Sequence, residues 1–272
     1  YFESIISSDK DGKGIVDGMV DFNGNGITDF FAVNGGNWMV LYDGKGAWQK
    51  INRSHIPINN LRFGDINGDK ITDVLYADLD GAILVSYKGI GSLVKINQVD
   101  ENYRDIRVGD FDGDDKTDLV YLRILGRQNK YDNSDTADMF VQYECKGDPK
   151  MLNSNYHLKP GGFDNNLFFG HFNKDNKTDV FRYDNNRFLV YWGGKGDYVV
   201  LNDELPNGIK PGNLLFANNL SAPGITDVIH VDPVNKKWVT FYGGKPGTLP
   251  MQMDVANPDK IFFGNVTGTA GW

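Results

Sequence analysis

The sequence predicts an all-β fold, a β-propeller built of four-stranded blades. A Thr-Asp dipeptide followed by two apolar runs recurs five times, and the repeat has the length of a propeller blade. The 33 glycines and the 13% of aromatic residues are typical of many tight turns between packed strands. The chain of 272 residues is long enough for one domain of this kind, and we assign residues 1–272 to it.

The Thr-Asp dipeptide marks the start of the second strand of each unit. It occurs at residues 28–29, 72–73, 117–118, 178–179 and 226–227, followed by apolar runs such as FFAV and WMVLY. A Gly/Lys turn and a short segment such as QKIN end each unit, and a piece such as LRFGD precedes the dipeptide. We therefore expect four short strands per unit, with repeats starting near residues 17, 61, 106, 167 and 214.

The spacing favours blades over a β-sandwich, which is the alternative all-β fold. Equivalent loops start at residues 21, 65, 110, 171, 219 and 265, so the units are 44, 45, 61, 48 and 46 residues long. Propeller blades have about 40–50 residues. A sandwich does not explain why one motif recurs five times in the same register.

The number of blades is left open by the two chain ends. Five complete repeats are followed by a partial one from residue 261, where IFFGN resembles the first strand of a unit. Proteins avoid exposed sheet edges. We therefore expect residues 1–7 to pair with residues 261–266, so that the terminal strands close a sixth blade.

Two insertions lengthen the third unit. They cover residues 123–138, between its second and third strands, and residues 153–166, after its fourth. In a four-stranded blade both lie on the face opposite the Thr-Asp loops, and long loops on a rigid scaffold often bind ligands. Tyr131, Tyr156 and Phe163 are candidate ligand contacts, with local packing beneath the long loops as the alternative.

Composition and motifs exclude several functional classes. The net charge of −8 argues against a nucleic-acid partner, because phosphate binding needs clustered Lys and Arg. Cys145 is the only cysteine, and no segment approaches the roughly 20 apolar residues of a membrane span. The chain contains no GxSxG, HExxH or P-loop element in a suitable context. We expect no catalysis, with a polysaccharide-active enzyme as the open alternative.

The loop before each of the first three dipeptides predicts a cation site. Its pattern is D-x-N-G-N-x-x-x-D, D-x-N-G-D-x-x-x-D and D-x-D-G-D-x-x-x-D. Calcium takes six to eight oxygen ligands, and the side chains at positions 1, 3, 5 and 9 can converge on one ion. Glycine at position 4 permits the tight turn. The backbone carbonyl of position 7 adds a ligand in each loop, from Ile27, Ile71 and Lys116.

FGDINGDKITD at residues 63–73 and VGDFDGDDKTD at residues 108–118 resemble the FG-GAP/VCBS repeats. These repeats form the propellers of integrin α subunits, of some lectins and of bacterial surface proteins and toxins. The resemblance extends over nearly the whole chain and implies an extracellular or cell-surface protein. It also implies that Ca²⁺ is held by Asp21, Asn23, Asn25 and Asp29, by Asp65, Asn67, Asp69 and Asp73, and by Asp110, Asp112, Asp114 and Asp118.

The last two loops depart from this pattern. The fourth has His171 at position 1, followed by Asn173, Asp175 and Asp179, and histidine is a poor calcium ligand. The fifth, with Asn219, Ser221, Pro223 and Asp227, is expected to be empty. We therefore predict three calcium sites, with the fourth open, and a strength that follows ligand charge from the third loop to the second to the first.

The predicted function is that of a calcium-stabilised, non-catalytic propeller. It would recognise a glycan or a protein ligand, as in cell adhesion, without inserting into a membrane. The alternative is a structural propeller within a larger adhesin or toxin.

Overall fold

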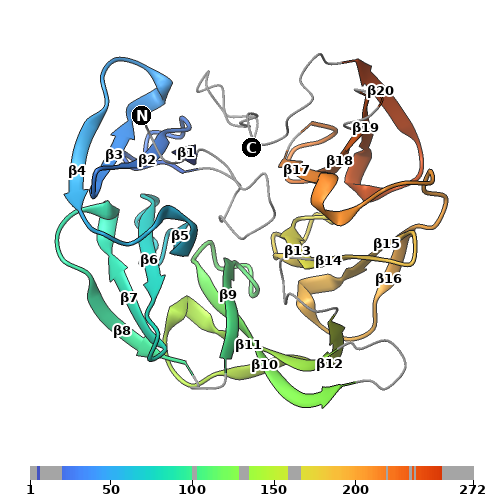
Figure 1. Ribbon diagram of the computed structural model, residues 1–272, viewed down its shortest axis with the longest axis horizontal. Helices are drawn as coiled ribbons and strands as arrows, with labels where there is room; N and C mark the ends of the chain where they lie inside the picture. The colour runs from blue at the N-terminus through green and yellow to red at the C-terminus, as the bar shows by residue number, and fades with distance from the viewer. Residues whose placement is uncertain are drawn as a thin grey trace.

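The computed structural model is a five-bladed β-propeller (Figure 1). It describes residues 5–6, 20–99, 103–128, 135–158, 167–218, 220–232, 235 and 237–252. These residues form five antiparallel four-stranded sheets and no α-helix. The sheets surround a common centre, with their fourth strands on the outside of the ring. The predicted all-β propeller of four-stranded blades is thus confirmed.

Each blade is a meander in which consecutive strands pair. The strands of the first two blades are β1 (Ile5–Ile6), β2 (Phe30–Asn34), β3 (Asn37–Leu41) and β4 (Gln49–Arg53), then β5 (Leu61–Gly64), β6 (Asp73–Ala77), β7 (Ala82–Ser86) and β8 (Val94–Gln98). The third blade has β9 (Tyr103–Gly109), β10 (Asp118–Gln128), β11 (Asp135–Gln142) and β12 (Lys150–Leu158). The last two have β13 (Leu167–Gly170), β14 (Asp179–Asp184), β15 (Arg187–Tyr191) and β16 (Val199–Asn202), then β17 (Leu214–Asn218), β18 (Thr226–Asp232), β19 (Lys237–Phe241) and β20 (Thr248–Gln252).

Single 3-10 turns complete the blades. Five of them join third strands to fourth strands, namely η2 (Tyr42–Gly44), η4 (Tyr87–Gly89), η5 (Tyr143–Cys145), η7 (Trp192–Gly194) and η9 (Tyr242–Gly244). Two more, η3 (Ile58–Asn60) and η8 (Pro211–Asn213), precede the first strands of the second and fifth blades. None of the helical segments in the described residues has the length and apolar character to cross a membrane.

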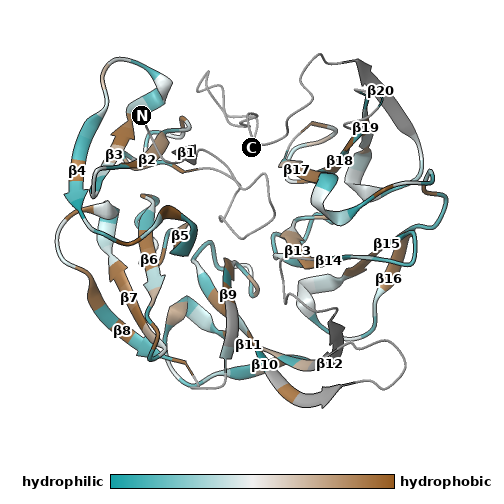
Figure 2. Cartoon of the chain, viewed as in Figure 1, coloured by the Kyte–Doolittle hydropathy of each residue, from teal (hydrophilic) through white to brown (hydrophobic). Residues whose placement is uncertain are grey.

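The strands are apolar on both faces because each blade packs against its neighbours. Phe31, Ala32 and Val33 are consecutive in β2, and all three are buried. One core cluster joins Phe31 and Trp38 of the first blade to Phe63 of the second, and similar clusters join the following blades. Figure 2 shows the hydrophobic residues along strands such as β3 and β7.

The Thr of the dipeptide bonds each blade to the preceding one. The backbone N–H of Thr72 donates to the carbonyl of Asp21 at 2.7 Å, and the Asp21 N–H donates to Oγ1 of Thr72 at 2.7 Å. The two residues are therefore held by a reciprocal pair of bonds. The same pair joins Thr178 to Asp110 and Thr226 to His171, and the Thr117 N–H donates to the Asp65 carbonyl.

The glycine before the loop permits this close approach of blades. A Cβ atom on Gly170 would lie 2.8 Å from Oγ1 of Thr226, and one on Gly109 would lie 2.8 Å from a methyl carbon of Thr178. Both distances are below van der Waals contact. At these two positions glycine is thus required by the neighbouring blade.

The first blade begins earlier than predicted. β1 pairs with β2 through Ile5 and Ala32 and through Ile6 and Phe31, so the first strand lies at Ile5–Ile6 and not near residue 17. The β-branched pair Ile5–Ile6 favours a strand. β1 thus belongs to the first blade, while its expected pairing with residues 261–266 stays a prediction. Residues 261–266 lie outside the described residues.

The insertions in the third blade form strands over much of their length. β10, β11 and β12 have 11, 8 and 9 residues, whereas β6 and β7 of the second blade have 5 each. Gln128 pairs with Asp135, and Asp135 pairs with Leu158, so both insertions leave the blade at the same end. The expectation of two polar loops is corrected to a three-stranded extension of the sheet.

We predict that Thr178→Val lowers the free energy of unfolding by about 1–2 kcal/mol, because the buried N–H of Asp110 loses its acceptor. Thr240→Val is the matched control, since the buried Thr240 hydroxyl has no hydrogen-bond partner among the described residues. Chemical denaturation measures both variants. Equal stability of the two would refute the role of Thr178 between blades.

Candidate metal centre in the Thr-Asp loops

The Asp of the dipeptide ties its own loop to the turn that follows the third strand. Asp73 accepts the Ile66 N–H on Oδ2 at 3.0 Å and the Lys88 N–H on Oδ1 at 2.8 Å. Asp29, Asp118 and Asp179 make the same two bonds, to Phe22 and Asp43, to Phe111 and Glu144, and to Phe172 and Gly193. Position 9 therefore has a structural role in the loop, whether or not it also binds metal.

Burial raises the pKa of these aspartates. All four are fully buried. Loss of hydration raises the pKa of Asp29 and Asp73 to about 6, and that of Asp118 and Asp179 to about 7. The backbone N–H donors act in the opposite direction, but desolvation is the larger effect.

The Asp at position 1 curls the loop around its carboxylate. Asp110 accepts the Gly113 N–H on Oδ1 at 2.7 Å and the Asp115 N–H on Oδ2 at 2.9 Å. Asp21 and Asp65 accept equivalent bonds. The glycine at position 4 has a φ of 70° to 82° in the three loops, a left-handed conformation that glycine adopts without strain. The role predicted for this glycine is confirmed.

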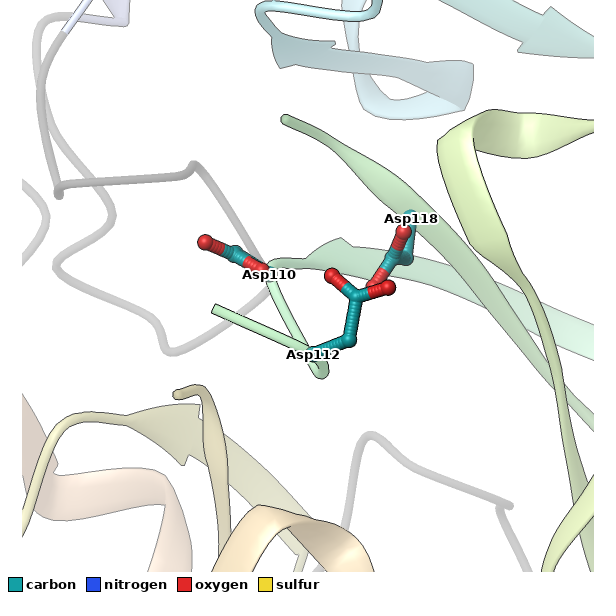
Figure 3. Close-up of side chains that lie close together, drawn as sticks. All are labelled: Asp110, Asp112 and Asp118. Atoms are coloured by element: carbon teal, nitrogen blue, oxygen red, sulfur yellow. The ribbon is translucent and has the colours of Figure 1, made fainter. Parts of the chain in front are cut away.

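The third loop gathers three of its four predicted side chains. Asp110, Asp112 and Asp118 each have an oxygen within 4.8 Å of the others (Figure 3). Two oxygens on opposite sides of a Ca²⁺ ion lie about 5 Å apart, so this donor set fits calcium. The fourth residue, Asp114, has its Oδ2 3.4 Å from Nζ of Lys116 instead.

The position-5 side chains organise the ends of the loops. The N–H of Ile27 donates to Oδ1 of Asn25 at 2.8 Å, and the same bond joins Ile71 to Asp69, Lys116 to Asp114 and Lys177 to Asp175. The predicted position-7 residues are thus held through their N–H groups. Metal binding by their carbonyls stays a prediction.

Three residues of the turns reach the loops and were missed by sequence reasoning. Asp43 accepts the side-chain amides of Asn25 at 2.8 Å and Asn23 at 3.4 Å. Nζ of Lys88 lies 3.2 Å from Oδ2 of Asp69. Glu144 lies 2.8 Å from Nζ of Lys116 in the third blade. All three occupy the middle of the Gly/Lys turn, and this fixed position was the available signal.

The last two loops are built differently. His171 replaces the carboxylate of position 1, and Lys174 replaces the glycine of position 4. Asn173 and Asp175 bond to each other, and Asp175 also keeps its bond from the Lys177 N–H. In the fifth loop the hydroxyl of Ser221 donates to Oδ1 of Asp227 at 2.6 Å, and the N–H of Gly243 donates to the same oxygen. Asp227 is thus bonded within its own loop and turn.

Asparagines of the fourth strands form a second contact between blades. The Asn52 side-chain amide donates to the carbonyl of Gly91 at 2.6 Å, and Asn153 donates to that of Gly196 at 2.9 Å. Asn97 does the same toward Gly147. These residues were also missed, because the partner lies in the next blade.

The candidate ligand contacts are only partly placed. Tyr131 and Phe163 lie outside the described residues. Tyr156 pairs with Ala137 in the extended third blade, but the structure describes only its backbone. These three residues stay a prediction.

We predict that the buried charge of Asp179 costs stability at neutral pH. Its native pKa of about 7 exceeds the ordinary 3.8, so its stabilising contribution is full below about pH 4 and is lost as the pH rises through about 7. In EDTA, the unfolding free energy of the wild type minus that of Asp179→Asn should fall over this range, by up to about 1.4 kcal/mol per pH unit. Asp197→Asn, on an exposed turn, controls for loss of a charge. A pH-independent difference would contradict the assignment.

Comparison with known proteins agrees with this geometry. Residues 21–76 match an FG-GAP-like repeat. No curated protein matches the chain. A chain of the Photorhabdus luminescens Tc holotoxin pore is similar in structure, with a TM-score of 0.56 and 14% identity over 86% of this chain. This chain spans 12% of that toxin chain.

A chain of a nidogen/laminin complex gives a TM-score of 0.45 at 11% identity, covering 83% of this chain and 76% of that one. At 14% identity the match to the toxin chain shows the fold alone. The repeat match covers the first Thr-Asp loop and extends into the second blade, and all five blades share one layout. The chain is a five-bladed β-propeller in which residues 21–76 match an FG-GAP-like repeat.

Proposed function

We propose that this chain is a calcium-stabilised, non-catalytic propeller that binds a protein ligand through its extended third blade, outside the cell or at its surface. The extension of β10, β11 and β12 carries the proposal, because it is the feature that breaks the repetition of the blades. Packing between blades does not require it. A binding role is consistent with a projection from a rigid scaffold.

The extension is a stiff structure at its base. β10 continues through residues 123–128, past the point where β6 ends in the second blade, and adds about 20 Å at 3.3 Å per residue. The Arg123 guanidinium lies 4.5 Å from the ring centroid of Phe140 and 3.5 Å from Asp138. A preorganised surface loses less conformational entropy on binding than a flexible loop.

A protein ligand is the favoured choice over a glycan. The toxin chain, of which this propeller spans 12%, is a precedent for such a propeller as one unit of a larger protein. Tyr131, Tyr156 and Phe163 are the proposed contacts. A glycan is the other outcome of the binding test.

Calcium is proposed to occupy the first three loops. The ligands would be Asp21, Asn23, Asn25 and Asp29, then Asp65, Asn67, Asp69 and Asp73, then Asp110, Asp112, Asp114 and Asp118, with the carbonyls of Ile27, Ile71 and Lys116. Two lysine ammonium groups lie beside position-5 carboxylates, which indicates that a nearby positive charge stabilises these carboxylates. Calcium would neutralise buried carboxylates and so stabilise the ring. We propose no catalytic role for these side chains.

We expect a chelator to lower the melting temperature, because a ligand bound only by the native state stabilises it. Asp112→Asn should reduce the rise in melting temperature that calcium produces, while changing stability in EDTA by less than about 0.5 kcal/mol. Asp112 is exposed and makes no hydrogen bond within the described residues. Its substitution therefore tests metal binding without removing a hydrogen bond. Asp148→Asn, an exposed turn variant, is the control. Calcium-independent melting of the wild type would refute the calcium proposal.

The binding proposal is tested by shortening the third blade. Replacing residues 125–136 by Asn-Gly would join the facing pair Ile124 and Ala137 through a two-residue turn. The buried Leu122 and Met139 are retained, so the melting temperature and calcium affinity should be nearly unchanged. Binding should be lost.

The ligand is first captured with the immobilised wild-type propeller from the surface proteins of its source, and a glycan array is probed in parallel. The dissociation constant of the purified ligand is then measured for both forms. Full binding by the shortened form would place the site elsewhere. A ligand found on the glycan array alone would replace the protein ligand by a glycan.

A further inference from the structure

The middle residue of each turn between the third and fourth strands has a left-handed backbone. Asp43, Lys88 and Glu144 have φ values of 55°, 56° and 50°, and Gly193 and Gly243 have 56° in the last two blades. Glycine adopts this conformation at least cost. The first three blades nevertheless have a side chain there, and these are the blades with the complete loop pattern.

The hydrogen bonds of the dipeptide Asp fix this residue beside the loop. The N–H groups of Asp43, Lys88 and Glu144 donate to Asp29, Asp73 and Asp118 at 2.7–2.8 Å. Each side chain therefore leaves the turn beside its own loop: Asp43 contacts positions 3 and 5, Lys88 contacts position 5, and Glu144 contacts Lys116 at position 7. Each contributes its charge to any ion bound there.

This charge differs between the first two blades. The first loop has Asp21 and Asp29 and gains the carboxylate of Asp43, which contacts its two asparagines. The second loop has three carboxylates of its own, but it gains the ammonium of Lys88. By the charges of the loop residues alone, the second site should bind a cation more tightly than the first. Counting the turn residue reverses that order.

We propose that Lys88 is a built-in counter-ion of the second loop, so that this loop binds a divalent cation more weakly than the first although it has the closer match to the calcium motif. The inference rests on the proposed calcium function. Asp43 has the opposite effect and compensates for the two asparagines of the first loop.

The contacts of Asp69 explain why Lys88 would compete with a metal. Its Oδ2 lies 3.2 Å from Nζ of Lys88 and accepts the Asn67 amide at 3.3 Å, while its Oδ1 accepts the Ile71 N–H. A cation at this loop must displace the ammonium from Oδ2. The Lys88 side chain is 44% exposed, so it can move into solvent, which makes the effect a competition and not a block.

The test compares Ca²⁺ binding by calorimetric titration in the wild type and two variants. Lys88→Asn removes the ammonium and places asparagine, which tolerates left-handed φ, in the turn. It should raise the affinity of one site about tenfold, because affinity follows the charge of the site. Asp43→Asn should lower the affinity of another site by a similar factor. Lys50→Asn, on the exposed face of β4, is the control with the same charge change.

A second readout does not depend on bound calcium. In EDTA, Lys88→Asn should melt below Lys50→Asn, because the carboxylates of the second loop lose their counter-ion. Adding Asp69→Asn to Lys88→Asn should abolish the gain in calcium affinity, which assigns that gain to the second loop.

The two proposals fail in different ways. Calcium binding by the wild type that is unchanged in Lys88→Asn overturns this inference alone. Absence of calcium binding in the wild type and both variants overturns the calcium function as well.

Discussion

The structure depends on one buried dipeptide. Its Thr bonds the backbone of the preceding blade, as Thr72 does at Asp21, while its Asp bonds the N–H groups of its own loop and turn, as Asp73 does at Ile66 and Lys88. Both residues are buried, so their polar groups must be satisfied within the protein. Position of the blade, shape of the loop and placement of the turn are thus set together by two adjacent residues.

The candidate metal sites follow from this constraint. Since Asp73 fixes both the loop and the turn, the loop residues can change from blade to blade while the frame is kept. Asp227 keeps the frame in the fifth blade, where Ser221 provides a hydroxyl donor in place of a ligand. The first three loops therefore share one backbone geometry and differ mainly in charge, so charge decides which of them suits a cation.

The repeat in the sequence predicted the blades, the strand order and the loop glycines, because these depend on local pattern. The roles of Gly109, Asn52 and Thr178 could not be predicted from the sequence, since the atoms that they contact belong to the next or the preceding blade. Repeat spacing also misplaced the first strand at residue 17, because Ile5–Ile6 is separated from its loop by residues that no other blade has. Lys88 and Asp43 were overlooked because they lie 14 or more residues after the loop in the sequence and reach it only when the blade has folded.

The span of the Thr bonds has a consequence for how the chain folds. They connect residues 51, 68 and 55 positions apart, which is about one blade in each case. Contact order therefore stays low for a β protein of this length, because each blade needs only its neighbour. Loop-closure entropy rises slowly with length, so the long third blade adds little to the barrier. Folding is expected to proceed by addition of blades along the ring, in the manner of a one-dimensional repeat array.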